Sequence, residues 1–492
     1  MTRTGGSSVH HTTLARADRP AGLSVPRLRA ALHGRVITPG DAAYDQARGG
    51  FYGGSDLHPA VLIRPVDAAE VAQVIALARD TGLELAVRSG GHTLAHHSTT
   101  NGGIVLDLAD MHALQIDPTR RTAWAQTGLT TGAYTSAAAA YGLATGFGDT
   151  ASVGIGGITL GGGIGYLVRK HGLTIDDLLA AELVTADGHL LHLDADHHPD
   201  LFWAIRGGGG NFGVATRFHY RLHPVDQILG GLLVLPATPQ VLAGFIAQAD
   251  AAPEQLSTIA NVLPAPPLPF LPPGHHGTLV IMATLAYAGD VEAGQRAVAP
   301  LRKLATPLAD LVRPMPYPQI YPPEEASYHP TAVGHNMFID TVDEQAAGTI
   351  LEHLQASTAP LSVAQLRVLG GAMARVPAQA TAFAHRASRL MVHLAAVYQR
   401  PEDAAEHRAW VDRLAAALHD GHGEARAYVN FVGDEGEARV HDAYPGPTWD
   451  RLAAIKARYD PTNLFHRNQN IPPANTATNR GPGNQNPKAG EG

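Results

Sequence analysis

The stretch LAVRSGGHTLAHHSTTNGGIVLD, residues 85–107, is the most informative part of the chain for the fold. Apolar residues at 85 and 87 give way to RSGGH at 88–92, and a second apolar run begins at Ile104. This pattern predicts a strand, a tight glycine turn and a returning strand. Paired glycines permit positive φ and bring backbone N–H groups close to an anion such as a pyrophosphate. A plain hairpin with an incidental histidine is the alternative.

Length and composition narrow the class of protein. A chain of 492 residues exceeds one ordinary core, so we expect two or three domains. A hydrophobic content of 45% with 16% charged residues is typical of a folded globular chain. The net charge of −8 argues against a nucleic-acid partner, because phosphate backbones are bound by lysine and arginine. Cysteine is absent, which excludes disulfides and thiolate metal ligands.

The ends of the chain and its hydropathy bear on location. Residues 1–22 contain no apolar core of a secretory signal, and nowhere do about 18 apolar residues run together. We therefore expect a cytoplasmic protein that does not enter a membrane. Residues 1–25 are polar and residues 474–492 are rich in Asn, Gly and Pro, which predicts two flexible ends.

Periodicity predicts alternating strands and helices in the first half. An apolar run at 60–65 is stopped by proline, and Asp67 then caps a helix whose apolar positions recur at three and four. We also expect strands over 122–127, 181–185, 189–193 and 214–222, and helices over 24–35, 131–141 and 199–205.

From Pro224 onward the pattern changes. Proline clusters separate strands from helices, as in an antiparallel α+β domain. Strands are expected over 277–285, 364–371, 385–397 and 427–431, and helices over 344–354, 403–419 (capped by Asp403) and 449–459.

Two further glycine-rich segments stand out. Residues 145–172 contain ten glycines interleaved with buried-type apolar residues, which favours packed backbone beside a flat or bulky ligand over a flexible linker. Residues 208–213 satisfy the dinucleotide pattern G-x-G-x-x-G, but the expected helix lies before it and the expected strand after it. A Rossmann NAD site needs the opposite order, so we do not expect one.

Histidine pairs raise the alternative of a metalloenzyme. The 27 histidines include the neighbours His96 and His97, and also His197 and His198. Neighbouring residues on a strand point to opposite sides, and no His-Glu-x-x-His motif occurs. The sequence therefore predicts no metal site.

Three separated stretches together resemble one known family. RSGGH with GGIVLDL (102–108), VGIGGITLGGGIG (153–165) with HGLTIDDL (171–178), and LFWAIRGGGGNFGV (201–214) are similar to the FAD domain of the vanillyl-alcohol-oxidase superfamily. Within it, YVNF (428–431) and the closing RYDPTNLF (458–465) and NQNI (468–471) resemble the berberine-bridge-enzyme-like oxidases. The resemblance covers about residues 60–472.

The resemblance implies an α+β fold. It combines a two-part PCMH-type FAD-binding domain with a substrate domain whose antiparallel sheet is covered by helices. We expect the FAD-binding domain over 26–225, the substrate domain over 226–440 and a C-terminal return to the FAD domain over 441–473. FAD is then the cofactor, and a small-molecule substrate and O2 are the partners of a monomer or homodimer.

The family also implies how FAD is attached. In such proteins the histidine of the RSGGH turn is bonded to the flavin 8α-methyl group, and here that residue is His92. Many relatives add a second link through a cysteine, whose place is taken by Thr150, so a single histidyl link is expected. Some singly linked relatives use a small polar residue there to admit O2, which makes Thr150 a candidate for that role.

Other expected FAD contacts follow from the same resemblance. Residues 88–93 would cradle the diphosphate, 154–165 would line the flavin, and 211–214 would contact the adenosine end or the ring edge. His96 stands where a glycine is more usual. The expected contacts are Arg88, Ser89, Gly90, Gly91, Thr93, His97, Ser98, Gly148, Asp149, Val153, Gly154, Gly157, Gly161, Gly162, Gly163, Gly165, Gly210, Asn211, Gly213, Val214, Asn468 and Asn470.

Tyr428 and Asn430 match the place where many relatives carry a catalytic base. A free tyrosine has a pKa of about 10, so its surroundings must lower that pKa for it to accept a proton. We expect Asn430, on the same strand face, to orient the phenol or the substrate. A half-buried structural tyrosine is the alternative.

The substrate pocket is expected in the second domain. Gln365 and Arg367, two residues apart, share a strand face and either line the pocket or form a surface pair. Some relatives place a glutamate after a His-Arg pair, where Val392 stands here, and the adjacent His393 is a substitute candidate.

The expected activity is that of an oxidase. Such an enzyme removes a hydride from a small alcohol, sugar, amine or secondary-metabolite intermediate, and O2 reoxidises the flavin to give H2O2. The alternatives are a flavin-dependent oxygenase or oxidative cyclase, a dehydrogenase with another acceptor, and a flavin-bearing scaffold without redox chemistry.

Overall fold

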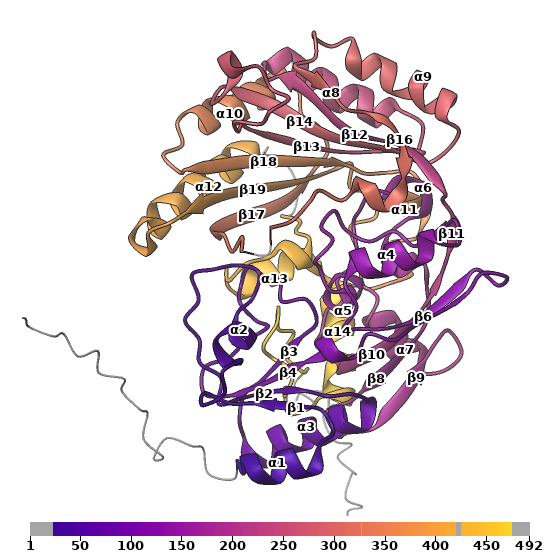
Figure 1. Ribbon diagram of the computed structural model, residues 1–492, viewed down its shortest axis with the longest axis vertical. Coiled ribbons are helices and arrows are strands. Elements are labelled where there is room, and N and C mark those ends of the chain that lie inside the picture. The colour runs from indigo at the N-terminus through magenta and orange to yellow at the C-terminus, as the bar shows by residue number, and fades with distance from the viewer. Residues whose placement is uncertain (1–22, 326, 420–424, 475–492) are drawn as a thin grey trace, which may run out of the picture.

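The computed structural model describes residues 23–325, 327–419 and 425–474. Most of the ends that we expect to be flexible, 1–22 and 475–492, lie outside these ranges. Two smaller sheets occupy one half of the molecule, and one large sheet with its helices occupies the other half (Figure 1).

The first sheet holds the RSGGH stretch. Its strand order is β1–β2–β4–β3, from β1 (Arg35–Ile37), β2 (Val61–Arg64), β4 (Ile104–Asp107) and β3 (Leu85–Arg88). Helix α3 (Ala68–Thr81) contributes its buried face to the same core. The Asp67 carboxylate accepts a hydrogen bond from the Glu70 N–H, as predicted for a cap. Helices α1 (Val25–Ala31) and α2 (Tyr44–Arg48) precede β1 and β2 respectively.

Residues 85–107 are not a hairpin, so the prediction of a returning strand is wrong. β3 and β4 pair in parallel, with Leu85 opposite Ile104 and Arg88 opposite Asp107. Residues 89–103 therefore leave the carboxyl end of β3 and travel back to the start of β4. The apolar runs predict two strands but carry no information on their relative direction. Ligands of parallel sheets bind at the carboxyl ends of strands, and the RSGGH turn lies there.

The second sheet is antiparallel and has the order β5–β6–β10–β8–β9. Its strands are β5 (Leu114–Asp117), β6 (Thr122–Gln126), β10 (Val214–Arg221), β8 (Leu178–Val184) and β9 (Leu190–Leu193). Around it lie α4 (Thr131–Ala139), α5 (Ile155–Leu160), α6 (Val168–His171), α7 (Pro199–Ala204) and the short pair β7 (Leu143–Ala144) and β11 (His223–Pro224). The strand and helix predictions for this half agree with these bounds within a few residues.

The large sheet has eight strands and is antiparallel throughout. The order is β15–β12–β14–β13–β18–β19–β17, and β16 also pairs with β12. The strands are β12 (Gln227–Pro236), β13 (Leu256–Pro264), β14 (Leu279–Tyr287), β15 (Ala309–Asp310), β16 (Arg313–Pro316), β17 (Thr331–Ile339), β18 (Leu361–Val368) and β19 (Leu390–Tyr398). This is the antiparallel α+β part that the sequence predicts after Pro224.

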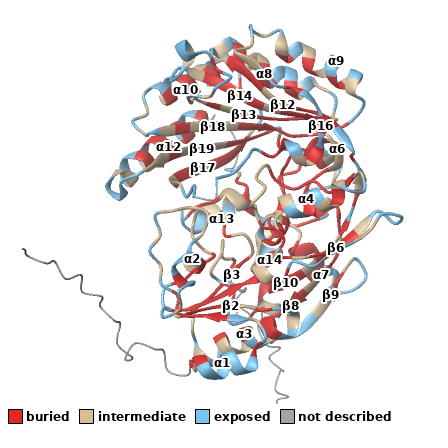
Figure 2. Ribbon diagram, in the orientation of Figure 1, coloured by how far each residue is buried: buried red, intermediate tan, exposed pale blue. Residues whose placement is uncertain are grey.

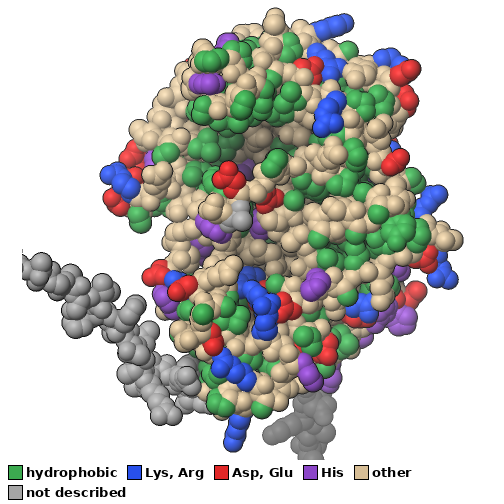
Figure 3. All heavy atoms as spheres, viewed as in Figure 1, with side chains coloured by type: hydrophobic (Ala, Val, Ile, Leu, Met, Phe, Trp, Pro, Cys, Tyr) green, Lys and Arg blue, Asp and Glu red, His purple; other side chains and the backbone are tan. Residues whose placement is uncertain are grey.

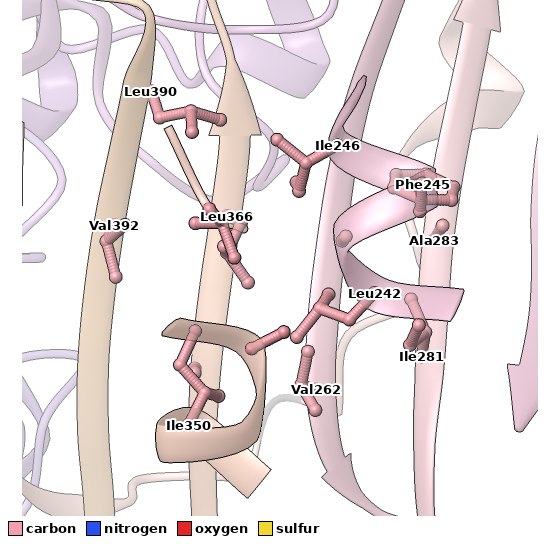
Figure 4. Close-up of a cluster of buried hydrophobic side chains, with 14 of the residues drawn as sticks. Leu242, Phe245, Ile246, Val262, Ile281, Ala283, Ile350, Leu366, Leu390 and Val392 are labelled. Atoms are coloured by element: carbon pink, nitrogen blue, oxygen red, sulfur yellow. The ribbon is translucent and has the colours of Figure 1, made fainter. Parts of the chain in front are cut away.

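Helices cover one face of this sheet. They are α8 (Pro239–Ala251), α9 (Val291–Arg302), α10 (Glu344–Gln355) and α12 (Ala404–Leu418) (Figure 1). Leu242, Phe245 and Ile246 of α8 pack on buried strand residues such as Val262 and Leu366 (Figure 4). The burial map shows these strands buried beneath helices with exposed outer faces (Figure 2). The opposite face of the sheet is turned toward the rest of the molecule.

Three local predictions for this half need correction. Residues 429–431 form a 3₁₀ turn (Val429–Phe431) rather than a strand, although their apolar and polar residues alternate. β19 begins at Leu390, because His385 and Arg386 belong to the preceding loop. Asp403 precedes α12, but its carboxylate binds Arg400 at 2.6 Å instead of capping the helix.

The C-terminal segment returns to the first half of the chain. After α11 (Ala372–Arg375), α13 (Glu437–Ala443) and α14 (Pro447–Tyr459), residues 460–471 run beside the glycine loop 207–213. The ammonium of Lys456 is buried and donates to Asp460 at 2.7 Å, to the Asn211 carbonyl at 2.7 Å and to the Phe465 carbonyl at 2.9 Å. These contacts join the C-terminal segment to the glycine loop of the first half.

Candidate active site

A cavity of about 550 Å³ lies between the helix-free face of the large sheet and the glycine loops of the first half. In the space-filling view, a hollow with hydrophobic side chains around it marks the junction of the two halves (Figure 3). The segments around the cavity are 51–52, 85–98, 148–164, 209–215, β17 to β19, the turn at 428–431 and residues 465–469.

Most of the predicted site residues line this cavity. They are Ser89, Gly90, Gly91, His92, Thr93, His97, Ser98, Gly148, Asp149, Thr150, Val153, Gly154, Gly157, Gly210, Gly213, Val214, Gln365, Arg367, His393, Tyr428, Asn430 and Asn468. The fold therefore brings these segments together around one cavity, although some are hundreds of positions apart.

The two glycine turns at 90 and 154 touch each other through their backbones. A Cβ on Gly90 would collide with the Gly154 backbone, and a Cβ on Gly154 would collide with Gly90 and Ser89. The Ser89 hydroxyl donates to the Thr127 carbonyl at 2.6 Å and accepts from the Gly156 N–H at 3.2 Å. These contacts fix the RSGGH turn against the start of α5.

His92 projects from this turn into the cavity. Its ring stacks on Phe51 with centroids 4.2 Å apart, and its Nε2 lies 2.9 Å from the Ser152 hydroxyl. Burial lowers the pKa of His92 to about 4, against the opposing charge of Glu324. The imidazole is therefore neutral at physiological pH, with Nε2 engaged by Ser152.

In the AHHST segment, His96 stands where a glycine is more usual in the family. His96 has φ of 53°, a left-handed conformation in which glycine is favoured. His97 lines the cavity, and its buried Nδ1 has no hydrogen-bond partner among the described residues. Burial, assisted by the charge of Arg467, lowers the pKa of His97 to about 4, so this ring is also neutral.

Some predicted FAD contacts have other roles in the structure. The Arg88 guanidinium points away from the cavity: it donates to the Gly49 carbonyl at 3.0 Å and to Asp107 at 2.8 Å, so its side chain is not free to bind a diphosphate. Gly161, Gly162, Gly163 and Gly165 do not line the cavity. A Cβ at these positions would press on Asn430, Phe383, Thr174 and the Phe147 carbonyl, respectively, so protein packing requires these glycines.

Asn211 and the C-terminal asparagines Asn468 and Asn470 are also expected FAD contacts, and two of the three lie outside the cavity lining. Asn211 holds the return segment, because its Nδ2 donates to the Gln469 carbonyl at 3.1 Å and its Oδ1 accepts from the Ile471 N–H at 2.9 Å. Asn468 lines the cavity and donates to the Gly210 carbonyl at 3.2 Å. Neither Asn211 nor Asn470 lines the cavity.

The cavity fits a large flat cofactor. Gly157 lies inside α5, where glycine is costly, yet it is exposed to the cavity and a Cβ there would meet no protein atom within 4 Å. Gly210 is similarly open, with Asn468 Nδ2 4.0 Å away. Buried polar atoms without protein partners, His97 Nδ1 and Asn468 Oδ1, belong to the same lining. Open glycines and unpartnered polar atoms together match the needs of a bound FAD.

Tyr428 and Asn430 meet although the strand expected to align them is absent. The Tyr428 hydroxyl oxygen accepts from Asn430 Nδ2 at 2.8 Å and from the Gly163 N–H at 3.0 Å. Asn430 Nδ2 also donates to the Ile158 carbonyl at 3.1 Å. Burial raises the pKa of Tyr428, while the hydrogen bonds from Asn430 and Gly163 oppose that rise. The expectation of a lowered pKa is therefore not met.

Polar groups of the sheet face the same region. Arg367 donates to Asp149 at 2.7 Å, to Gln365 Oε1 at 2.7 Å and to the Ile164 carbonyl at 3.1 Å. Gln365 and Arg367 thus line the cavity rather than the surface. Val392 packs in the core under the helices, whereas His393 faces the cavity, so the glutamate position of some relatives has no counterpart at Val392.

Two lining residues, Phe51 and Tyr52, and one contact beside the cavity, that of Ser152, have no counterpart in the sequence-based expectations. Phe51 and Tyr52 enter the cavity from a loop whose glycine flanks, GGFYGG at 49–54, were a usable signal. Burial raises the pKa of Tyr52 to about 12, with the charge of Asp149 adding to the effect. Ser152 binds His92, and its N–H donates to Glu324 at 3.0 Å, a contact across the two halves that no local pattern could predict.

Two negative findings apply to the described part of the chain. Across 23–325, 327–419 and 425–474, no group of three or more His, Asp or Glu side chains is placed to hold a metal ion. None of the helices in these same ranges combines the length and the apolar character needed to cross a membrane.

A parallel strand ending in a glycine turn, a glycine-lined cavity and a covering antiparallel sheet define an FAD-binding class of protein. Two family models match accordingly, one described as FAD binding domain over residues 59–194 and one as berberine and berberine like over residues 427–472.

Individual relatives agree with this class. YvdP, an FAD-linked oxidoreductase of Bacillus subtilis, is 31% identical over 464 residues, which is 90% of this chain and 99% of that protein. (R)-6-hydroxynicotine oxidase of Paenarthrobacter nicotinovorans is 30% identical over 475 residues, 90% of this chain and 97% of that protein. The crystal structure of 6-hydroxy-D-nicotine oxidase from Arthrobacter nicotinovorans has a TM-score of 0.79 at 27% identity, covering 90% of this chain and 98% of that one. The chain belongs to the berberine-bridge-enzyme-like family of FAD-linked oxidoreductases.

Proposed function

We propose that this protein is an oxidase that takes two electrons from a small molecule and releases H2O2. Bound FAD supplies the two-electron acceptor and returns the electrons to O2. The observation that carries the proposal is the Tyr428–Asn430 pair in the wall of the cavity, because it places a phenol oxygen among N–H donors beside the polar face of the sheet.

In this proposal the phenolate form of Tyr428, a small fraction at neutral pH because the pKa is raised, accepts the proton of the substrate hydroxyl or amine. Only the phenolate form can accept a proton, and burial keeps the pKa of Tyr428 above its usual value. The N–H groups of Asn430 and Gly163 stabilise the negative oxygen and hold that pKa lower than burial alone would. Asn430, fixed by the Ile158 carbonyl, also keeps the phenol in one position.

We also propose that FAD is attached through one covalent link, at His92. The supporting features are the neutral imidazole, its place in the cavity wall and the absence of cysteine from the chain. Ser152 engages Nε2, so Nδ1 is the ring nitrogen that would hold the flavin. The stack on Phe51 holds the ring plane in place.

A screen for peroxide tests the oxidase proposal. Purified protein is mixed with alcohols, oligosaccharides, cyclic amines and phenolic compounds in air, and H2O2 is measured. We expect peroxide from at least one class and anaerobic bleaching of the flavin by the same compound. Bleaching without peroxide in air would indicate a dehydrogenase, and product without bleaching would remove the redox proposal.

Thr150 is the proposed control point for O2. It lines the cavity two residues before Ser152, and its hydroxyl donates to Asp149 at 3.3 Å. Thr150→Val keeps the size of the side chain but removes this hydroxyl, so we expect flavin reoxidation to slow more than flavin reduction does. Stopped-flow measurement of both half-reactions checks this, and equal slowing would show that Thr150 has no specific role toward O2.

A further inference from the structure

The cavity-facing side of the large sheet changes from apolar to polar along its strands. Pairing of β17, β18 and β19 arranges their residues in rows across the sheet. One row holds Ala332, Val397 and Leu361, and the next row holds Gly334, Ala395 and Val363. Ala332, Leu361, Val363, Ala395 and Val397 all line the cavity. The first two rows therefore offer no side-chain hydrogen-bonding group.

The next rows are polar and lie beside Tyr428. Asn261, Gln365 and His393 stand side by side, and Gln365 Nε2 donates to Asn261 Oδ1 at 2.9 Å. Arg367 lies one row further along the sheet. Its guanidinium carbon lies 5.1 Å from the centre of the Phe431 ring. Phe431 in turn lies 5.6 Å from the Tyr428 ring. The polar end of the sheet is thus the end that adjoins the proposed proton acceptor.

Among the residues that the structure describes, this polar end carries no unpaired charge. The Arg367 guanidinium is neutralised by Asp149 at 2.7 Å and donates further to Gln365 and Ile164. A charged substrate would have no counterion here, and an unpaired charge in a buried site is costly. The ion pair of Arg367 and Asp149 instead presents a fixed hydrogen-bonding surface with no net charge.

His393 is a polar lining group with hydrogen-bonding capacity that the protein does not use. The residue lines the cavity, and its buried Nδ1 has no hydrogen-bond partner among the described residues. Burial, assisted by the charge of Arg367, lowers the pKa of His393 to about 4, so the ring is neutral. A neutral imidazole exchanges one hydrogen bond with a hydroxyl or another uncharged polar group.

Phe51 and Leu94 continue the apolar end. Phe51 and Tyr52 line the cavity together with Leu94, and the Leu94 side chain lies against Gly334 of the second row. The Gly53 N–H donates to the Pro330 carbonyl at 3.0 Å, which ties the aromatic loop to the segment before β17. The apolar rows of the sheet and the loop that carries Phe51 therefore both border the apolar end of the cavity.

We propose, as a refinement that rests on the oxidase function above, that the preferred substrate is an uncharged amphipathic molecule. Its reacting hydroxyl, or a similar neutral polar group, lies among Gln365, His393 and Tyr428, and its apolar body lies along Val363 and Ala395. An oligosaccharide would leave hydroxyls unpaired against the apolar rows, and a carboxylate would lack a free cation.

Calorimetry with three alcohols on the flavin-loaded protein tests this. The probes are 4-butylbenzyl alcohol, 4-(hydroxymethyl)benzoate and cellotriose. Since each buried methylene favours binding, we expect 4-butylbenzyl alcohol to bind about tenfold or more tightly than either of the others. Val363→Asp should weaken that binding about tenfold, and Val363→Ala, which keeps the row apolar, should preserve the order of the three ligands.

The outcomes separate this proposal from the oxidase proposal, because calorimetry is done without O2 on protein whose flavin has been reduced beforehand, and so measures binding without turnover. Equal or tighter binding of the carboxylate or of cellotriose would overturn the substrate class, as would unchanged binding in a flavin-loaded Val363→Asp variant. If that variant does not fold, the ranking of the three ligands on the unmodified protein still decides. If the three ligands bind in the expected order but no peroxide is released, the result contradicts the oxidase function and leaves the substrate class in place.

Discussion

Tyr428 is buried, and its hydroxyl oxygen accepts hydrogen bonds from Asn430 at 2.8 Å and from the Gly163 backbone at 3.0 Å. If this oxygen takes the substrate proton, Tyr428→Phe should slow anaerobic flavin reduction by about 10²–10⁴-fold while leaving flavin content unchanged. Tyr134→Phe is the matched control, because Tyr134 is equally buried but binds Thr145 outside the cavity lining. Equal rates in the two variants would remove Tyr428 from the chemistry.

The pH dependence follows from the same pKa. Burial raises the pKa of Tyr428, so the phenolate fraction, and with it the rate of reduction, should increase about tenfold per pH unit through the neutral range. Asn430→Leu removes a donor that lowers this pKa, so its profile should move to higher pH. A rate that is independent of pH, or a shift toward lower pH, would contradict proton transfer to Tyr428.

Sequence patterns were most successful at the level of residue types in short motifs. His92, Tyr428 and Asn430 are expected at the site because several separated stretches together resemble one family, and all three line the cavity, even where the expected element is wrong. Arg88 is a residue for which the motif does not predict the side-chain contacts. Its guanidinium donates to Asp107 and to the Gly49 carbonyl, which is far away in the chain. Side-chain partners that are far apart in the chain, such as Ser152 with Glu324, leave no local signal.

Helix α5 shows how an element is adapted to a ligand. Gly157 lies inside this short helix at a point where it is exposed to the cavity and a Cβ would meet no protein atom within 4 Å. Gly157→Ala should therefore raise the free energy of unfolding of the flavin-free protein by about 0.5–1 kcal/mol, because alanine is the better helix former. The same methyl group would oppose close approach of FAD, so flavin content after purification should fall.

These two effects have opposite signs, which makes the test specific. Flavin content is measured by absorbance, and stability by thermal unfolding of flavin-free protein. Gly40→Ala is the control, because Gly40 also has open space but lies outside the cavity lining. Unchanged flavin content in Gly157→Ala would show that FAD does not approach α5.

At the level of elements, periodicity predicts the strands and helices but not their pairing. The runs at 85–88 and 104–107 are strands, yet only the structure shows that they are parallel. The alternation at 427–431 resembles a strand, but Tyr428 and Asn430 are held by backbone groups of the glycine-rich segment, and tertiary contacts favour a 3₁₀ turn. Local preference is weak where such contacts dominate.

The molecule as a whole depends on the C-terminal return. Lys456 and Asp460 are both fully buried and paired at 2.7 Å, and they join α14 to the Asn211 loop. Lys456→Met would leave the Asp460 carboxylate buried without its cation, so we expect a loss of about 3–5 kcal/mol in the free energy of unfolding. Flavin content should fall with it, because the return segment borders the cavity.

Arg458→Met on the same helix provides the comparison. Arg458 pairs with Asp200 at 2.8 Å, but its side chain is 66% exposed, so its loss should cost no more than about 1 kcal/mol. Chemical denaturation of both variants checks the difference. Equal losses would mean that the buried pair does not hold the two parts of the chain together.

We propose that one imidazole, that of His92, tethers FAD in the cavity. Flavin fluorescence of the protein band on a denaturing gel tests it most directly, using the unmodified protein and His92→Ala. We predict a fluorescent band from the unmodified protein and none from His92→Ala. Flavin that is fully extracted from the unmodified protein by denaturation, or a fluorescent band that persists in His92→Ala, would contradict the claim.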